Sequence, residues 1–79
     1  ERIFIVEDDV VISREVSGYL RSWGYDAKSA VDFGNIMGEF SAFEPNLVLL
    51  DISLPFFNGF HWCSEIRKIS SVPIVFISS

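Results

Sequence analysis

Carboxylate side chains follow two apolar segments of this sequence, where they could take part in chemistry. Glu7 and Asp8 follow the apolar run at residues 2–6, and Asp51 follows four aliphatic residues at 47–50. An apolar run without polar alternation is typical of a strand that is buried on both faces. Burying an unpaired charge is costly, so an acid at the end of such a strand is either solvated at the sheet edge or kept there for a use.

The rest of the chain alternates strand and helix patterns. We expect strands at residues 2–6, 25–30, 47–50 and 72–79, with one helix in each interval between them. Asp9 and Asp32 are expected to cap the first two helices, and Gly24 to end the first. Each predicted helix has a stripe of apolar residues, and we expect the stripe of the third helix to face inward. In chain order the stripes are Ile12, Val16, Tyr19, Leu20 and Trp23; Phe33, Ile36, Met37, Phe40 and Phe43; and Phe60, Cys63, Ile66 and Ile69.

Alternating strands and helices indicate a parallel sheet with right-handed crossovers, sandwiched by helices. In such a sheet, ligands bind outside the carboxyl ends of the strands, at the point where the strand order reverses. If the order is 2-1-3-4, the first and third strands are neighbours, and Glu7, Asp8 and Asp51 meet at one place. Clustered carboxylates tolerate one another best around a cation, and an all-oxygen ligand set suits Mg²⁺.

Composition narrows the classes of function. The chain has 79 residues, 49% of them hydrophobic, which is enough for one small globular domain. Its net charge of −5 argues against direct nucleic-acid binding by this domain. A single cysteine, Cys63, excludes an internal disulfide and fits a reducing cytosol. Because no stretch reads as a membrane span or a signal peptide, we expect a soluble, cytoplasmic domain that does not enter a membrane.

Taken in order, these features resemble the receiver domains of bacterial two-component response regulators. The matching pieces are "IFIVEDD" at residues 3–9, Asp51 closing an apolar strand, "LP" at 54–55, Gly59, and "PIVFIS" ending at Ser78. The match covers essentially the whole chain. "RIFIVEDD" and "LPFFNGFHWC" are most similar to regulators with a winged-helix DNA-binding output, and among those to regulators that answer cell-envelope antibiotics.

The resemblance implies a flavodoxin-like, doubly wound parallel sheet that presents Asp51 as a phosphoacceptor for a sensor histidine kinase. Asp8 would ligate Mg²⁺ directly and Glu7 largely through water, together with Asp51 and the backbone carbonyl of Ser53. Ser78 would donate its hydroxyl to a phosphoryl oxygen as the switch. The domain would then be an acceptor rather than an enzyme, and it would control an output domain outside this chain, of the DNA-binding transcription-regulator kind.

Two further expectations concern the loop after Asp51. Pro55 and Gly59, with Asn58, would shape this loop and start the third helix. The aromatic pair at 56–57 is unusual in a loop, and it either packs on the rim of the sheet or forms part of a kinase-contact surface.

The chain also departs from the family pattern. The family has a fourth helix, a fifth strand that carries a lysine, and a fifth helix, whereas Lys28 and Lys68 lie at other positions. We therefore expect a receiver domain that spans residues 1–79 and is incomplete at its C-terminus, truncated before those three elements. Its last strand would be left as an apolar sheet edge, which invites pairing with another chain. A homodimer would use a surface that is mostly absent from this chain.

Three other classes of function share some of these features. A phosphohydrolase of the haloacid dehalogenase type places a second aspartate two residues after its nucleophile, where this chain has Ser53. A pseudo-receiver that never takes phosphate tends to lose one of the acids, and here Glu7, Asp8 and Asp51 are all present. A flavodoxin-like cofactor binder would need a phosphate-cradling loop rich in Gly, Ser or Thr after the first strand, where this chain reads "VEDDVV".

Overall fold

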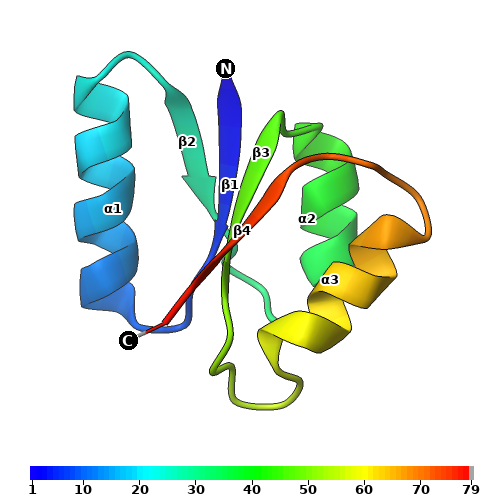
Figure 1. The fold of residues 1–79 in the computed structure, drawn as a ribbon. Coiled ribbons are helices and arrows are strands. Elements are labelled where there is room, and N and C mark those ends of the chain that lie inside the picture. The colour runs from blue at the N-terminus through cyan, green and yellow to red at the C-terminus, as the bar shows by residue number, and fades with distance from the viewer. Residues whose placement is uncertain (79) are drawn as a thin grey trace.

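The computed structural model describes residues 1–78, and a parallel four-stranded sheet runs through its centre (Figure 1). In chain order the elements are β1 (Arg2–Val6), α1 (Val10–Ser22), β2 (Asp26–Ser29), α2 (Ile36–Phe43), β3 (Leu47–Asp51), α3 (Gly59–Arg67) and β4 (Ile74–Ile77). The strand order is β2-β1-β3-β4 with all neighbours parallel, which confirms the predicted topology. Among the helices of residues 1–78, none has the length and apolar character that a membrane crossing requires.

Side chains of the two central strands alternate between two core clusters, one on each face of the sheet. On one face, Phe4 packs edge-on against Phe40 of α2, with ring centroids 6.3 Å apart, and Ile66 of α3 belongs to the same cluster. On the other face, Ile3 and Ile5 pack with residues of α1. α1 therefore covers one face and α2 and α3 the other, which explains why β1 and β3 have no polar alternation (Figure 1).

The apolar stripe that predicted the first helix packs on the sheet only in part. Val16 and Leu20 pack on the sheet, but Tyr19 and Trp23 are 65% and 71% exposed. These two rings lie one turn apart on the helix flank, with centroids 6.3 Å apart, and contact each other instead of the core. The buried residues of α1 are two serines, Ser13 and Ser17, which the apolar pattern did not predict. Asp9 caps the helix as predicted, because its carboxylate accepts hydrogen bonds from two backbone N–H groups of the first turn.

The predicted start of the second helix is wrong. α2 begins at Ile36, and Asp32 does not cap it, because its Oδ1 accepts a hydrogen bond from the N–H of Gly34 at 2.9 Å in a local turn. The carboxylate of Glu39 instead reaches back and accepts the N–H of Val31 and that of Asp32. Phe33 thus lies before the helix, although it still packs against the core.

The predicted inward face of the third helix is also only half right. Ile66 is fully buried, but Phe60 is exposed and leans on Phe76 of β4, with ring centroids 5.0 Å apart. Ile69 is exposed because it lies beyond the end of α3 at Arg67. β1 has the predicted bounds, and β3 is one residue longer than predicted because it includes Asp51. The other two strands are shorter: β2 covers four residues and β4 runs from Ile74 to Ile77. Residue 79 of the predicted last strand lies outside the described residues.

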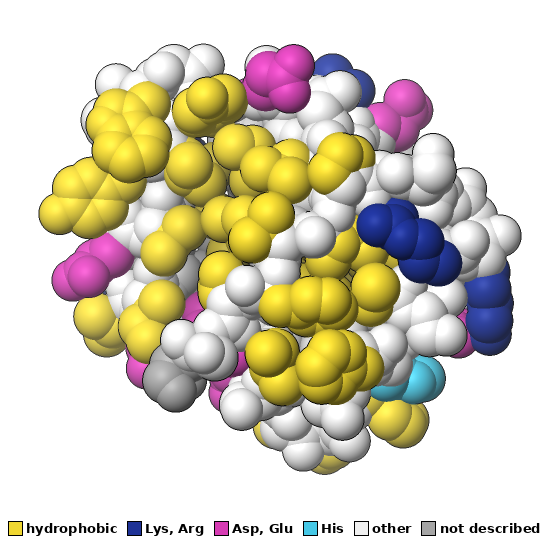
Figure 2. Space-filling view, in the orientation of Figure 1, with side chains coloured by type: hydrophobic (Ala, Val, Ile, Leu, Met, Phe, Trp, Pro, Cys, Tyr) yellow, Lys and Arg dark blue, Asp and Glu magenta, His cyan; other side chains and the backbone are white. Residues whose placement is uncertain are grey.

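Apolar side chains gather over the centre of the face seen in Figure 2, between the two helical layers. In β4, Val75 is 48% and Phe76 37% exposed, and β4 pairs only with β3 within residues 1–78. This open apolar edge strand agrees with the prediction from the sequence.

Candidate functional site

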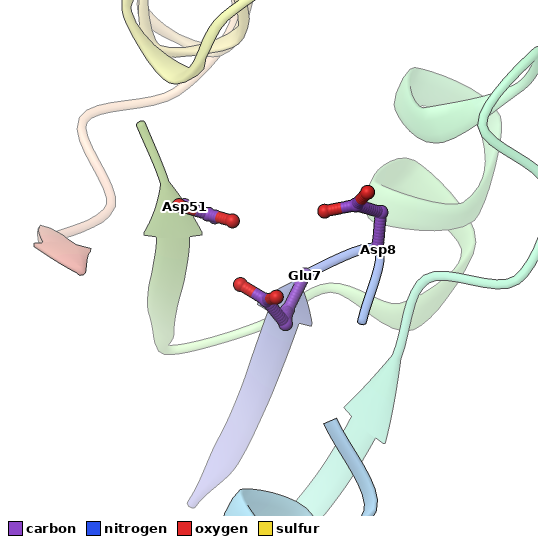
Figure 3. A group of neighbouring side chains, drawn as sticks. All are labelled: Glu7, Asp8 and Asp51. Carbon is purple, nitrogen blue, oxygen red and sulfur yellow. The ribbon is translucent and has the colours of Figure 1, made fainter. Parts of the chain in front are cut away.

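Three carboxylates converge at the carboxyl ends of β1 and β3. The parallel register pairs Val6 with Leu50, so the next residues of the two strands, Glu7 and Asp51, lie side by side. Figure 3 shows Glu7, Asp8 and Asp51 turned toward a common space, and one carboxylate oxygen from each lies within 4.8 Å of the others. The predicted convergence of these acids is therefore confirmed.

Two of the three acids are buried and are held by backbone donors. Asp51 is 1% exposed and Glu7 5%, whereas Asp8 is exposed. The Oδ1 atom of Asp51 accepts a hydrogen bond from the N–H of Ser53 at 3.0 Å. The Oε1 atom of Glu7 accepts one from the N–H of Asp9 at 3.2 Å. Backbone geometry thus fixes both carboxylates before any ligand arrives.

The surroundings of Glu7 raise its pKa from 4.5 to about 7. Burial is the largest cause, the hydrogen bond to Asp51 and the negative charges of Asp51 and Asp8 act in the same direction, and the N–H of Asp9 opposes them. Near neutral pH, Glu7 therefore exists in both protonation states. Such a group is sensitive to any cation that binds beside it.

The loop after β3 is folded back onto the backbone of Asp51. Asn58 caps α3 by accepting the N–H of His61 at 3.1 Å, and the N–H of Gly59 donates to the carbonyl of Ile52 at 2.9 Å. A Cβ atom at Gly59 would collide with the carbonyl oxygen of Asp51. The sequence predicted that Gly59 shapes the loop, but not this contact, because the collision depends on the return path of the loop.

The donor set fits Mg²⁺. All three groups are carboxylates, and with bonds of about 2.1 Å the oxygen ligands of octahedral Mg²⁺ are about 3.0 Å apart when neighbouring and about 4.2 Å apart when opposite. The oxygens of Glu7, Asp8 and Asp51, which lie within 4.8 Å of one another, have to move closer together to ligate one ion. Three converging acids with no cationic side chain among them favour a hard cation.

The remaining predicted site residues lie near the cluster, but their roles stay predictions. Ser53 is exposed two residues after Asp51. Ser78 is exposed and directly follows Ile77, the register partner of Asp51, so β4 brings it to the same edge of the sheet. Pro55 is exposed in the loop before α3. Lys28 pairs with Glu39 and Lys68 with Glu65, so within residues 1–78 neither lysine forms an ion pair with the three carboxylates.

The two aromatic residues of the loop have different surroundings. Phe57 stacks on His61, with ring centroids 4.2 Å apart, and contacts Trp62 edge-on at 5.9 Å. Phe56 is 85% exposed. Phe57 therefore packs against α3 and attaches the loop to this helix, whereas the neighbouring Phe56 projects into solvent.

Comparison with known proteins gives a consistent family. The family model of the response regulator receiver domain matches residues 3–79. The transcriptional regulatory protein YvcP of Bacillus subtilis is 51% identical over 78 residues, which are 99% of this chain and 33% of that protein. The N-terminal domain of the lantibiotic response regulator NsrR is 46% identical with a TM-score of 0.91, over 99% of this chain and 66% of that chain.

A third similar protein has been solved with ligands. The response regulator TrrA of Thermotoga maritima, in complex with Mg²⁺ and BeF, is 28% identical with a TM-score of 0.88, over 99% of this chain and 69% of that chain. TrrA has also been solved in complex with the histidine kinase ThkA. This chain spans about a third of the length of YvcP, by its 33% coverage. The fold, the family match and these relatives agree that the chain belongs to the receiver-domain family of response regulators.

Proposed function

We propose that Asp51 accepts a phosphoryl group from a sensor histidine kinase in a Mg²⁺-dependent reaction. The observation that carries this proposal is a buried carboxylate whose oxygen lies within 4.8 Å of oxygens of Glu7 and Asp8. Membership of the receiver family supports the same role, as do the complexes of TrrA with Mg²⁺ and BeF and with a histidine kinase.

The transfer forms a bond between a carboxylate oxygen of Asp51 and phosphorus, and breaks the bond between phosphorus and an imidazole nitrogen of the kinase histidine. The product is an acyl phosphate. Phosphoryl transfer depends on positioning and on charge neutralisation, and the hydrogen bond from Ser53 to Oδ1 fixes the rotation of the acceptor carboxylate. Mg²⁺ held by Glu7, Asp8, Asp51 and the carbonyl of Ser53 would neutralise charge on the phosphoryl oxygens, and the hydroxyl of Ser78 would donate to one of them.

The arrangement favours a stable acceptor over a turning-over hydrolase. A hydrolase of this kind needs a second acid two residues after the nucleophile, and Ser53 stands there instead. All three carboxylates of the cluster are present, which also favours an active receiver over a pseudo-receiver. At most, the domain would catalyse its own phosphorylation and dephosphorylation.

The output of the domain is proposed from its relatives. YvcP is a transcriptional regulatory protein about three times as long as the region that it shares with this chain, which supports a DNA-binding output domain outside these residues. The net charge of −5 supports DNA binding by that domain rather than by this one. A homodimer formed on phosphorylation would use surface outside this chain.

The test is the intact mass of the full chain after incubation with acetyl phosphate, with Mg²⁺ and separately with a chelator. We expect one phosphoryl adduct that requires both Mg²⁺ and Asp51. Asp51→Asn should lose the adduct, whereas Asp26→Asn, which alters an exposed carboxylate at the start of β2, should keep it. An adduct that persists in Asp51→Asn would remove Asp51 from this role. Steady consumption of acetyl phosphate without an adduct would point to a hydrolase.

A further inference from the structure

A groove of about 500 Å³ lies between α1 and β2, with Glu7 and Asp8 at one end. Its volume is within the range of small-molecule sites. Three hydroxyl side chains and three cationic side chains line it: Ser13, Ser17, Ser29, Arg14, Arg21 and Lys28. Neither the carboxylate cluster nor the proposed phosphotransfer uses these six residues.

The floor of the groove is formed by buried helix positions, where apolar side chains are usual, but the residues there are polar. Ser13 and Ser17 are 8% and 4% exposed, and they occupy the positions of α1 that face β2. The Oγ atoms of Ser13 and Ser29 are hydrogen-bonded at 2.5 Å, and Ser17 donates to the carbonyl of Arg14. Small side chains at these positions leave the space between helix and strand open, and their hydroxyls give it a hydrogen-bonding surface.

The rim of the groove concentrates positive charge in an acidic chain. The sequence has six Lys and Arg residues in all, and three of them line this groove. The guanidinium of Arg21 is fixed by two hydrogen bonds to the carbonyl of Ala27, at 3.2 and 2.8 Å. Lys28 has a loose ion pair with Glu39 at 3.9 Å, and Arg14 takes part in neither of the ion pairs within residues 1–78. Arg14 and Lys28 therefore have donors to offer to a ligand.

We propose that this groove binds the phosphate group of a small anionic molecule, with Arg14 and Lys28 as the main contacts. Arginine pairs with phosphate through two parallel hydrogen bonds, and lysine adds a point charge. The hydroxyl of Ser29 lies on the strand that carries Lys28 and adds a donor. Val31 and Phe33, which also line the groove, offer an apolar surface to the rest of a phosphate ester.

The site is independent of the proposed phosphotransfer, since it needs neither Asp51 nor a metal. In the presence of a chelator no metal offsets the charge of Glu7, Asp8 and Asp51, so phosphate is not expected at Asp51. An anion in the groove then has to lie toward Arg14 and Lys28, away from the end that Glu7 and Asp8 occupy. This separates the groove from the acceptor site experimentally.

The test is a titration of the full chain with inorganic phosphate, and in a second arm with phenyl phosphate, in the presence of chelator and followed by amide NMR. We expect shifts that saturate at Ser13, Arg14, Lys28 and Ser29. Arg14→Gln and Lys28→Gln should each weaken binding about 10-fold, as the loss of a charge-assisted hydrogen bond predicts. Lys68→Gln makes the same change of charge just after the end of α3, outside the groove lining, and should leave the affinity within about 2-fold.

Tighter binding of phenyl phosphate would support a phosphate ester as the ligand, and equal binding would support free phosphate. If Lys68→Gln weakened phosphate binding as much as the two groove variants do, the proposal would be overturned, because the attraction would then depend on the net charge of the protein and not on the groove. An absence of saturable shifts at millimolar phosphate, or shifts confined to residues 51–59, would also overturn it. The two groove variants lie on different elements, so a folding defect in one, seen as a loss of dispersed amide signals, leaves the other to decide the test.

Discussion

The carboxyl ends of β1 and β3 bury carboxylates, whereas β4 exposes apolar side chains. Asp51 is 1% exposed and Glu7 is buried beside it, while Val75 of β4 is 48% exposed. Apolar side chains are usually buried and charged ones exposed, whereas the first region buries charged groups and the second exposes apolar groups. The two regions are close in the fold, since β1 and β4 both pair with β3.

The two regions differ in the contacts that surround the unusual side chains. At the acid edge, backbone N–H groups bond to both buried carboxylates, and Gly59 lets the loop close over the backbone of Asp51. Within residues 1–78, no buried side-chain nitrogen or oxygen lacks a hydrogen-bond partner. Among the described residues, Phe76 of β4 has Phe60 as its one aromatic neighbour, and Phe60 is itself exposed. The first region is therefore held rigidly, and changes there should be costly, whereas changes in the second should be tolerated.

The largest effect is expected from Gly59→Ala. Its Cβ would collide with the Asp51 carbonyl, and overpacking of this kind costs about 1–3 kcal/mol of unfolding free energy. Gly18→Ala in α1 is the matched control, because no atom lies within 4 Å of its Cβ; it should stabilise by about 0.5–1 kcal/mol. Urea unfolding of both variants measures the contrast. A Gly59→Ala variant as stable as the Gly18→Ala variant would mean that the loop is not packed on Asp51.

The next effect concerns Mg²⁺ binding and pH. With its pKa near 7, Glu7 is mostly protonated at pH 6 and mostly ionised at pH 8, and a cation has to displace that proton. We expect the dissociation constant for Mg²⁺ to be about 10-fold larger at pH 6 than at pH 8. Calorimetry in two buffers of different ionisation enthalpy measures both the affinity and the proton release. Glu7→Gln, which has no proton to lose, should bind with little pH dependence in this window; an equally steep dependence in that variant would assign the proton to another group.

Much of the acid edge was predictable because its signals are local in sequence. An apolar run that ends in Asp51, and another that ends before Glu7 and Asp8, predict two strands and the edge at which they finish. Alternation with helices then predicts parallel neighbours, and the observed order β2-β1-β3-β4 agrees. The contact of Gly59 was not predictable, since it requires the path of the whole loop.

The exposed apolar side chains were harder to predict. An apolar stripe shows which side of a helix is apolar, but it does not show how much of that side the sheet covers. Tyr19 and Trp23 continue the stripe of Val16 and Leu20 but lie beyond the reach of the sheet. The capping role expected of Asp32 failed for a different reason, since an aspartate can satisfy a turn as readily as a helix end.

A smaller effect tests whether the exposed aromatic ring beside the acid edge serves a partner. Phe56 is 85% exposed in the loop that follows Asp51. The end of this loop returns to its start, because the N–H of Gly59 donates to the carbonyl of Ile52. If the proposed kinase covers this loop when it reaches Asp51, Phe56→Ala should slow transfer from the phosphorylated kinase about 5-fold, close to 1 kcal/mol. Phosphorylation by acetyl phosphate should not change, because a small donor needs no docking surface.

Trp23 provides the control for this experiment, as an exposed aromatic residue at the far end of α1. Trp23→Ala should leave both rates unchanged. Equal slowing of the kinase and acetyl phosphate reactions by Phe56→Ala would instead assign Phe56 to the shape of the acceptor loop.

The smallest effect is expected at the open face, where Val75→Thr replaces one β-branched side chain by another. With half of the side chain in water, the change in unfolding free energy should stay within about 0.5 kcal/mol. Val48→Thr on the paired strand β3 makes the same replacement at a fully buried position, where an added hydroxyl without a partner costs about 1–3 kcal/mol. Urea unfolding at two protein concentrations measures both. A cost at Val75 that matches the cost at Val48, and that grows with protein concentration, would show that a second copy of the chain covers β4 in solution, because only an intermolecular contact depends on concentration.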